Sequence, residues 1–257
     1  MLSYRFACAT DPGRVRPNNE DTVRIEPDIG LVVVADGLGG YNAGEVASRL
    51  CCDTVAEIVR TASTPRAADE RLRSAIEAAN QRIHAHAQRH AAYHGMATTV
   101  VAVLVSGEQL TVAHVGDSRL YRLRHGRLVA LTRDHTLVQE YIDAGWLHPD
   151  DIHHVDYRNI VTRAVGALPA VTVDVAKHTV QAGDTYLLCS DGLTEMLSDA
   201  EIEAILCNAP LGPATALALI DAANAAGGSD NIAVAMIYCT NTGGSPHAHA
   251  DHHARWT

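Results

Sequence analysis

The sequence predicts an α+β fold in which α-helices pack on antiparallel β-sheets. Two observations carry this prediction. Segments with the pattern of β-strands occur in clusters rather than in alternation with single helices, and two long amphipathic segments lie together between two of these clusters. With 257 residues, of which 47% are hydrophobic and only one is Phe, the chain can bury a sizeable core built mainly from aliphatic side chains.

The predicted strands are apolar, rich in β-branched residues and bounded by turn-forming residues. They cover residues 4–10, 22–26, 31–36, 98–105, 110–117, 119–124, 171–180, 184–191 and 231–239. The run at 31–36, LVVVAD, is apolar at every position before its aspartate, which is typical of a strand in the core.

The two long predicted helices cover residues 43–62 and 66–90, and each has one apolar stripe at helical spacing. The first stripe consists of Val46, Leu50, Thr54 and Ile58, and the second of Leu72, Ile76, Ala79 and Ile83. Two further helices fit residues 199–207 and 213–226, and the glycines at 227 and 228 end the last of them.

Residues 1–240 are expected to form one domain, with a polar, His-rich flap at about 135–160 that contains one short helix. The flap histidines His148, His153 and His154 fit a solvated loop better than a proton-transfer role. Residues 241–257 begin with Gly, Ser and Pro and continue with several His, so we expect a disordered tail.

Composition excludes several classes of protein. The net charge is −10, which argues against a nucleic-acid-binding surface because such a surface needs a basic stripe. No apolar run approaches the ~20 residues that span a bilayer, and the N-terminal segment does not resemble a secretion signal. The six cysteines show no CxxC spacing and suit a reducing compartment. We therefore expect a cytoplasmic protein, and we also expect it to be a monomer.

Aspartates stand at the ends of several predicted strands. Asp36, Asp117 and Asp191 each close an apolar run, and Asp230 directly precedes another. In an antiparallel sheet the end of one strand lies beside the start of the next, so these carboxylates can meet at one edge. Grouped carboxylates repel each other unless a cation lies between them, and Mg²⁺ or Mn²⁺ prefers oxygen ligands.

A turn is the simpler explanation for each Asp-Gly pair taken alone, since this dipeptide is common in turns. Here two Asp-Gly pairs follow apolar strands, and an SDN motif precedes a third apolar strand. Taken together, they favour a metal site as much as they favour simple turns. Gly37 would then also let its carbonyl group face a metal ion that a side chain would crowd.

The segment RVRPNNEDT at 14–22 supplies a positive charge close to acidic residues. Alone it fits a solvated loop. Beside a two-metal site, Arg16 could bind a phosphate group with two parallel N–H bonds, and Glu20 and Asp21 could hold metal-bound water.

In chain order, the motifs RPNNED, VVVADGLGG, VAHVGDSRLY, LTRDH, IVTRAVG, LLCSDGL and GGSDNIAVAMI resemble one known family. It is the family of metal-dependent protein serine/threonine phosphatases, the PPM or type 2C class, in its compact bacterial form. The resemblance extends from about residue 4 to residue 239. It implies two packed antiparallel sheets flanked by pairs of helices, with two Mn²⁺ or Mg²⁺ ions at one edge.

The resemblance also implies the metal ligands. Asp36 would bridge both ions, the carbonyl of Gly37 would bind one of them, and Asp191 and Asp230 would complete the other. Asp117 matches an aspartate that, with Asp191, holds a weaker third ion in bacterial members.

Outside the metal ligands, Arg16 matches the phosphate-binding arginine, and Glu20 and Asp21 match the acidic pair that orders metal-bound water. The sequence departs from the family pattern at two positions. Leu38 stands where many members have a histidine proposed as general acid, and Ala97 stands where glycine is usual. The first departure leaves the proton donor to the leaving group undefined; for the second we expect only a packing consequence.

The expected reaction is hydrolysis of phosphoserine and phosphothreonine in proteins by a water bridging the two ions, without a phosphorylated enzyme. The expected partners are phosphorylated proteins, including a Ser/Thr kinase that the enzyme opposes. Two alternatives remain: a non-catalytic binding or sensor domain of the same fold, and the same hydrolysis on phosphohistidine or a non-protein phosphate.

Overall fold

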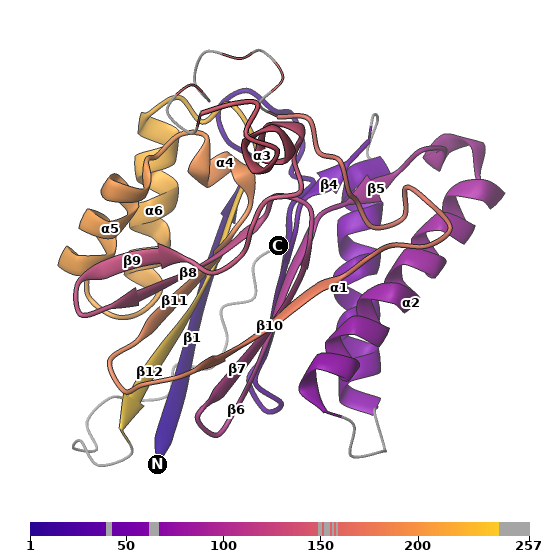
Figure 1. The fold of residues 1–257 in the computed structure, drawn as a ribbon. Helices are drawn as coiled ribbons and strands as arrows, with labels where there is room; N and C mark the ends of the chain where they lie inside the picture. The colour runs from indigo at the N-terminus through magenta and orange to yellow at the C-terminus, as the bar shows by residue number, and fades with distance from the viewer. Residues whose placement is uncertain are drawn as a thin grey trace.

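The computed structural model describes residues 1–39, 43–61, 67–148, 151, 155, 157 and 159–241. Two five-stranded antiparallel sheets face each other at the centre of the molecule (Figure 1). The first sheet has the order β1 (Leu2–Asp11), β12 (Ile232–Asn241), β11 (Thr185–Cys189), β8 (Arg119–Arg124), β9 (Arg127–Ala130). The second has the order β10 (Asp174–Thr179), β7 (Gln109–Val115), β6 (Val100–Ser106), β3 (Leu31–Ala35), β2 (Thr22–Glu26).

Helices cover the outer face of each sheet, as Figure 1 shows. The helices α1 (Ala43–Thr61) and α2 (Ala68–Arg89) pack on the second sheet, and a short 3-10 helix, η1 (Ala91–Tyr93), follows α2. On the first sheet lie α4 (Asp191–Thr194), α5 (Asp199–Asn208) and α6 (Pro213–Ala225). The expected α+β sandwich, flanked by helix pairs, is therefore confirmed. None of the described helices is long and apolar enough to cross a membrane.

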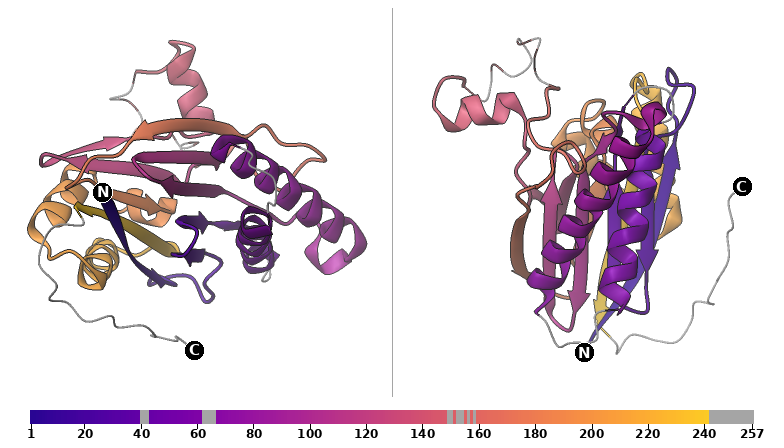
Figure 2. Two further views of the ribbon diagram at one scale, coloured as in Figure 1. Left: turned by 90° about the horizontal axis from the view of Figure 1, so that it is seen from below. Right: turned by 90° about the vertical axis from the view of Figure 1, so that its right-hand side faces the viewer.

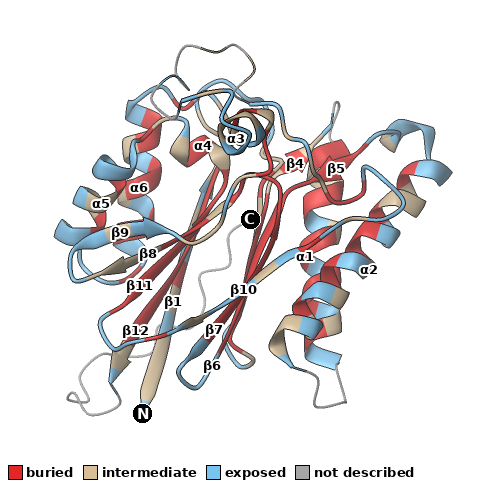
Figure 3. Ribbon diagram, viewed as in Figure 1, coloured by how far each residue is buried: buried red, intermediate tan, exposed pale blue. Residues whose placement is uncertain are grey.

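Strand β3 explains why the run LVVVA contains no polar residue. Its side chains alternate between two cores: Leu31, Val33 and Ala35 pack under α1 and α2, whereas Val32 and Val34 pack between the two sheets. Since β3 lies inside its sheet with both faces covered, all five residues are buried. The strands β6 and β7 of the same sheet are likewise buried along most of their length (Figure 3). The burial of β3 fixes the position of the chain immediately before Asp36.

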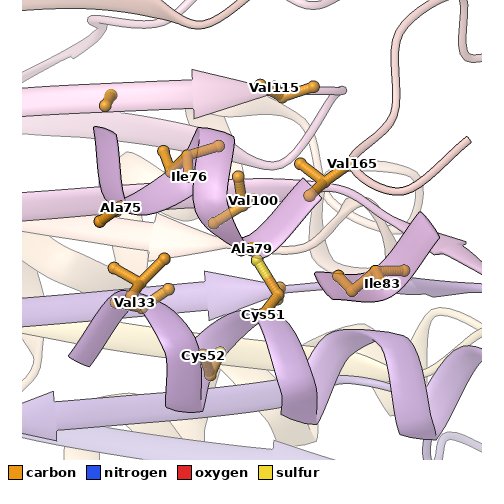
Figure 4. Close-up of a cluster of buried hydrophobic side chains, with 14 of the residues drawn as sticks. Val33, Cys51, Cys52, Ala75, Ile76, Ala79, Ile83, Val100, Val115 and Val165 are labelled. Carbon is orange, nitrogen blue, oxygen red and sulfur yellow. The ribbon is translucent and has the colours of Figure 1, made fainter. Parts of the chain in front are cut away.

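The apolar stripe expected on α1 is wrong in part. Thr54 is buried, but Val46, Leu50 and Ile58 are only half-buried. The face in the core carries Ala43, Ala47, Cys51, Cys52, Val55 and Val59. Small residues allow α1 to lie close to both the sheet and α2, so the larger side chains are displaced to its flanks; Figure 4 shows Cys51 directed at Ala79 of α2. The stripe expected on α2 is confirmed, with all four residues buried.

Several boundaries differ from those expected. The strands β4 (Gly37–Leu38), β5 (Ala97–Thr98) and β9 were not expected, because two or four residues carry too little periodicity. β10 begins at Asp174 rather than at residue 171, and β12 continues to Asn241. The expected strands that end at Asp36, Asp117 and Asp191 stop before these residues, and Asp191 is instead the first residue of α4.

The flap projects from the sandwich (Figure 2). Within its described residues it holds one short helix, α3 (Leu137–Asp143), as expected. The hydroxyl of Thr136 caps α3 by accepting from the backbone N–H of Gln139. His153, His154 and the predicted tail at 242–257 lie outside the described residues.

Candidate active site

A cleft of about 510 Å³ opens at the edge of the sandwich where several strands end. It is lined by Arg16, Pro17, Asn18, Glu20, Asp36, Gly37, Leu38, Gly39, Asp191, Asp230 and Asn231. The sheet register explains this convergence. Cys189 of β11 pairs with Val234 of β12, so the chain after β11 and the chain before β12 reach the same edge.

The backbone of Asp36 is held by two threonines at the start of the β5–β6 segment. The Asp36 carbonyl accepts from the Thr98 hydroxyl at 2.7 Å and from the Thr99 N–H at 2.8 Å. The Asp36 N–H in turn donates to Thr99 Oγ1 at 3.2 Å. Because Thr98 and Thr99 are fully buried, the Asp36 carboxylate is presented from a rigid position.

The carboxylates strongly perturb each other. At the floor of the cleft, burial raises the pKa of Asp36 well above its usual value, and the charges of Asp21 and Asp117 raise it further. The pKa of Asp191 is also raised well above its usual value, mainly by burial and further by the charges of Asp36 and Asp117. These effects show that the predicted aspartates, although far apart in sequence, form one cluster.

Two further carboxyl groups complete the cluster. Burial raises the pKa of Asp21 to about 8, even though Ser190 Oγ donates to Asp21 Oδ2 at 2.6 Å. Burial also raises the pKa of Asp117 to about 6, with the charge of Asp134 adding to it. Asp117 does not line the cleft; it lies behind Asp36 and Asp191, whose pKa values it raises.

The cluster fits hard divalent cations. Asp21 Oδ1 and Asp191 Oδ1 are buried, and among the described residues neither oxygen has a hydrogen-bond partner. A buried oxygen without a partner is costly, and so is a group of unneutralised carboxylates. Divalent cations such as Mn²⁺ or Mg²⁺ remove both costs, because their ligands are carboxylate and carbonyl oxygens.

Arg16 lies at the mouth of the cleft. Its Nη2 donates to Asp230 Oδ2 at 2.7 Å, and its side chain is 55% exposed. The other oxygen of Asp230 accepts from the Asn231 N–H at 2.8 Å. Arg16 therefore lines the cleft and is paired with a predicted metal ligand, and its phosphate-binding role remains a prediction.

The expected acidic pair is divided between two places. Glu20 lines the cleft and is half-buried, and this burial raises the pKa of its carboxyl group. Asp21 points the other way, into the buried contact with Ser190. Neighbours in a strand or an extended segment point to opposite sides, so only one of the two residues can face the cleft.

Gly37 is required by close packing. A Cβ at this position would lie 2.3 Å from the carbonyl of Gly44 and 2.7 Å from the carbonyl oxygen of Glu20. The start of α1 and the segment before β2 therefore both approach the backbone that follows Asp36. This is a different reason from the one expected from the sequence, and the direction of the Gly37 carbonyl toward a metal remains a prediction.

Asn231 and Ser190 were not recognised in the sequence as site residues. Asn231 accepts from the Glu20 N–H at 2.7 Å and donates to the carbonyls of Pro12 and Asn18 at 3.0 and 2.8 Å. It thereby fixes the segment that carries Arg16 and Glu20. The available signals were the Asn of the SDN motif and a serine directly before an aspartate, at the end of an apolar strand.

Comparison with known proteins agrees with this fold. The family model described as Protein phosphatase 2C matches residues 17–214. The serine/threonine phosphatase stp of Listeria monocytogenes is 37% identical over 234 residues, which is 89% of this chain and 93% of that protein. The protein phosphatase PhpP of Streptococcus pneumoniae is 36% identical over 89% of this chain and 94% of its own length.

Solved structures show the same architecture. The crystal structure of the Mycobacterium tuberculosis serine/threonine phosphatase PstP/Ppp matches with a TM-score of 0.87 and 36% identity, over 94% of this chain and all of that chain. The catalytic domain of the serine/threonine phosphatase PstP in complex with two manganese ions matches with a TM-score of 0.85.

The chain belongs to the protein phosphatase 2C family, and it is an enzyme of the protein phosphatase class. The resemblance seen in the sequence motifs, the fold class and the class of enzyme are thus confirmed.

Proposed function

We propose that this protein hydrolyses phosphoserine and phosphothreonine in proteins, with two Mn²⁺ or Mg²⁺ ions as cofactors. The observation that carries the proposal is the cluster of Asp21, Asp36 and Asp191, in which two buried oxygens have no hydrogen-bond partner among the described residues. Asp36 and Asp191 line an open cleft, and Asp21 is buried beside them. When bound, such ions lower the pKa of water and neutralise charge on the phosphoryl group. The named activities of the relatives and the manganese in the PstP structure support the same reaction.

The metal-binding roles are those that the family resemblance implies. Asp36, the carbonyl of Gly37, Asp191 and Asp230 would hold the two ions, and Asp191 and Asp230 meet at the same edge of the sheet because β11 pairs with β12. Asp117, whose charge raises the pKa values of Asp36 and Asp191, would hold a weaker third ion together with Asp191.

Arg16 binds the phosphoryl oxygens of the substrate. For this it must exchange its contact with Asp230 for a contact with the phosphate. Both Asp230 and a phosphate are anionic partners for the guanidinium group, and Asp230 is released when a cation neutralises it. Metal binding would therefore free Arg16 for the substrate.

The remaining groups of the cleft set the position of water and the leaving group. Glu20 faces the cleft and holds water there, whereas Asp21 acts from the buried side of the cluster. Leu38 also lines the cleft and offers no proton, so the alkoxide of serine or threonine would receive its proton from water or from a neighbouring group.

The substrates are phosphorylated proteins, including a Ser/Thr kinase whose action this enzyme opposes, and the enzyme acts as a cytoplasmic monomer. The flap, whose described helix α3 projects from the sandwich, would contact the protein part of a substrate (Figure 2). A non-catalytic role is disfavoured because every carboxylate expected to bind metal is present.

The test combines chelation with substitution in the full chain. Excess chelator should abolish hydrolysis of an aryl phosphate and of a phosphothreonine peptide, and added Mn²⁺ should restore both. Activity that survives the chelator would contradict the proposal, as would unchanged hydrolysis in Asp36→Asn and Asp191→Asn. Hydrolysis of the aryl phosphate without release of phosphate from any phosphopeptide would favour a non-protein substrate instead.

A further inference from the structure

A second polar cluster lies behind the active site, where the flap joins the sandwich. Its members are His114 of β7, His135 at the start of the flap, Asp174 of β10 and Arg163 after the flap. His135 Nε2 lies 3.3 Å from Asp174 Oδ2 and 3.1 Å from Arg163 Nη1, and Arg163 Nη1 donates to Asp174 Oδ1 at 2.9 Å. Ligand atoms of His114, His135 and Asp174 lie within 4.8 Å of one another, a spacing that suits a metal ion.

The geometry of the rings excludes a shared metal ion in this arrangement. His114 and His135 are stacked, with ring centroids 4.7 Å apart and an angle of 10° between the ring planes. A metal ion bound to an imidazole lies close to the plane of its ring, and two nearly parallel planes do not meet at a common point nearby. Arg163 would also place a positive charge beside such an ion.

The hydrogen bonds of His135 indicate a different role. Its Nδ1 accepts from the Gly116 N–H at 3.0 Å, and its own backbone N–H donates to the Gly116 carbonyl at 3.0 Å. Since Nδ1 is an acceptor, the proton of the neutral ring is on Nε2, where Asp174 can accept it. The contact of Arg163 Nη1 with Nε2 is then not a hydrogen bond, because both nitrogens carry protons, and Arg163 is held by its hydrogen bond to Asp174 instead. Burial and the neighbouring His114 and Arg163 lower the pKa of His135, which favours this neutral ring.

Gly116 directly precedes Asp117 and is held on its other side as well. Its φ of 101° favours glycine, and a Cβ here would lie 2.6 Å from Thr99 Cβ. The Thr99 hydroxyl lies 2.7 Å from Ser118 Oγ and accepts from the Asp36 N–H. The loop of residues 116–118 is therefore clamped between His135 and Thr99, with the buried Asp117 at its centre.

We propose that His135 is a positioning residue that holds Asp117 in place for the weak third metal ion. This inference rests on the proposed function, which assigns that ion to Asp117. His135 acts through the backbone of Gly116, with Asp174 selecting the ring tautomer. The His135 carbonyl also accepts from the Thr162 N–H at 2.8 Å, so the same residue joins the two ends of the flap. The position of the flap is thus coupled to the position of Asp117.

The test compares two variants of His135 whose amide side chains each imitate a different ring nitrogen. In His135→Asn the side-chain oxygen takes the place of Nδ1 and can accept from Gly116, whereas in His135→Gln it takes the place of Nε2 and cannot. Mn²⁺ binding to the chelator-treated full chain is measured by titration calorimetry and by electron paramagnetic resonance of the free ion. We expect His135→Gln to weaken the weakest Mn²⁺ site by about tenfold, while His135→Asn stays close to the wild type.

The outcomes separate this inference from the function on which it rests. The role of His135 alone would be overturned if both His135 variants weakened Mn²⁺ binding equally. It would also be overturned if His135→Gln bound Mn²⁺ like the wild type while Asp117→Asn lost the weak site. Wild-type binding in Asp117→Asn would overturn the assignment of Asp117 and this inference with it. Nitrogen NMR of the wild type needs no variant: a proton on Nδ1 of His135 would overturn the proposal, and a proton on Nε2 supports it.

Discussion

Leu38 and Ala97 are direct cross-strand partners in the small β4–β5 sheet. These are the two positions at which the sequence departs from the family pattern. Ala97 is buried, and Leu38 lines the cleft at the edge of the carboxylate cluster. The methyl group of Ala97 therefore lies on the strand that pairs with the strand of Leu38. The two departures stand opposite each other in one small sheet, so the effect of Ala97 is not limited to the packing consequence that the sequence suggested.

The Leu38 position predicts an effect on the leaving group. Leu38→His should raise the rate on a phosphothreonine peptide by about tenfold, because a general acid can protonate the departing alkoxide. The rate on an aryl phosphate should change little, since a phenolate leaves without protonation. Parallel assays of the two substrates measure the difference. Leu38→Gln, polar but without an acid, serves as the control, and an equal gain in this variant would contradict the prediction.

The aspartate cluster predicts that substitution of its own members lowers activity, whereas substitution of an aspartate outside the cluster does not. Asp36→Asn and Asp191→Asn should each lower kcat by at least about 10²-fold, because each removes charge that binds a catalytic cation. Steady-state kinetics at saturating Mn²⁺ gives the comparison. Asp53→Asn, at an exposed aspartate of α1, is the matched control and should retain wild-type activity. A comparable loss in Asp53→Asn would mean that the assay reports stability.

The contact between Arg16 and Asp230 predicts opposite effects on substrate and metal. Arg16→Ala should lower kcat/KM by roughly 10- to 100-fold, because a hydrogen bond to a charged group is lost. Mn²⁺ affinity should stay equal or increase, since Asp230 no longer has a competing cation. Arg16→Lys should recover only part of the activity because lysine cannot donate two parallel bonds. Weaker Mn²⁺ binding with unchanged kcat/KM would contradict this role.

The pKa of Asp21 predicts how the metal-free protein responds to pH. Since its pKa is raised to about 8 in the folded state, the folded protein keeps a proton that the unfolded chain has already released. Stability therefore falls as the pH rises through this value. In excess chelator, the melting temperature should drop between about pH 7 and pH 8.5, a window in which histidines are already neutral.

Mn²⁺ should raise the melting temperature more at the higher pH, because cations then replace protons as the partners of the carboxylates. Asp21→Asn removes the titrating group and should show a smaller drop in chelator. A melting temperature that rises across this window, or a stabilisation by Mn²⁺ that is the same at both pH values, would contradict the prediction. Scanning calorimetry with and without Mn²⁺ measures all of these quantities.

Much of the fold was predictable because its signals are local. The run before Asp36 is apolar at every position, and the structure places it in a strand with both faces covered. The stripe of α2 was also visible, since large apolar residues recur at helical spacing. The stripe of α1 was misread because its buried face carries small residues, whose choice depends on how closely two other elements approach.

The sequence by itself determined which carboxylates lie next to the ends of strands, and the order of its motifs identified the family. Only the tertiary structure decided how these residues meet: Arg16 with Asp230 across 214 positions, Ser190 with Asp21 across 169, and Leu38 opposite Ala97. Local pattern fixes which residue types a segment presents. Which of them become partners depends on strand order and register, and these are set by packing between segments far apart in the chain.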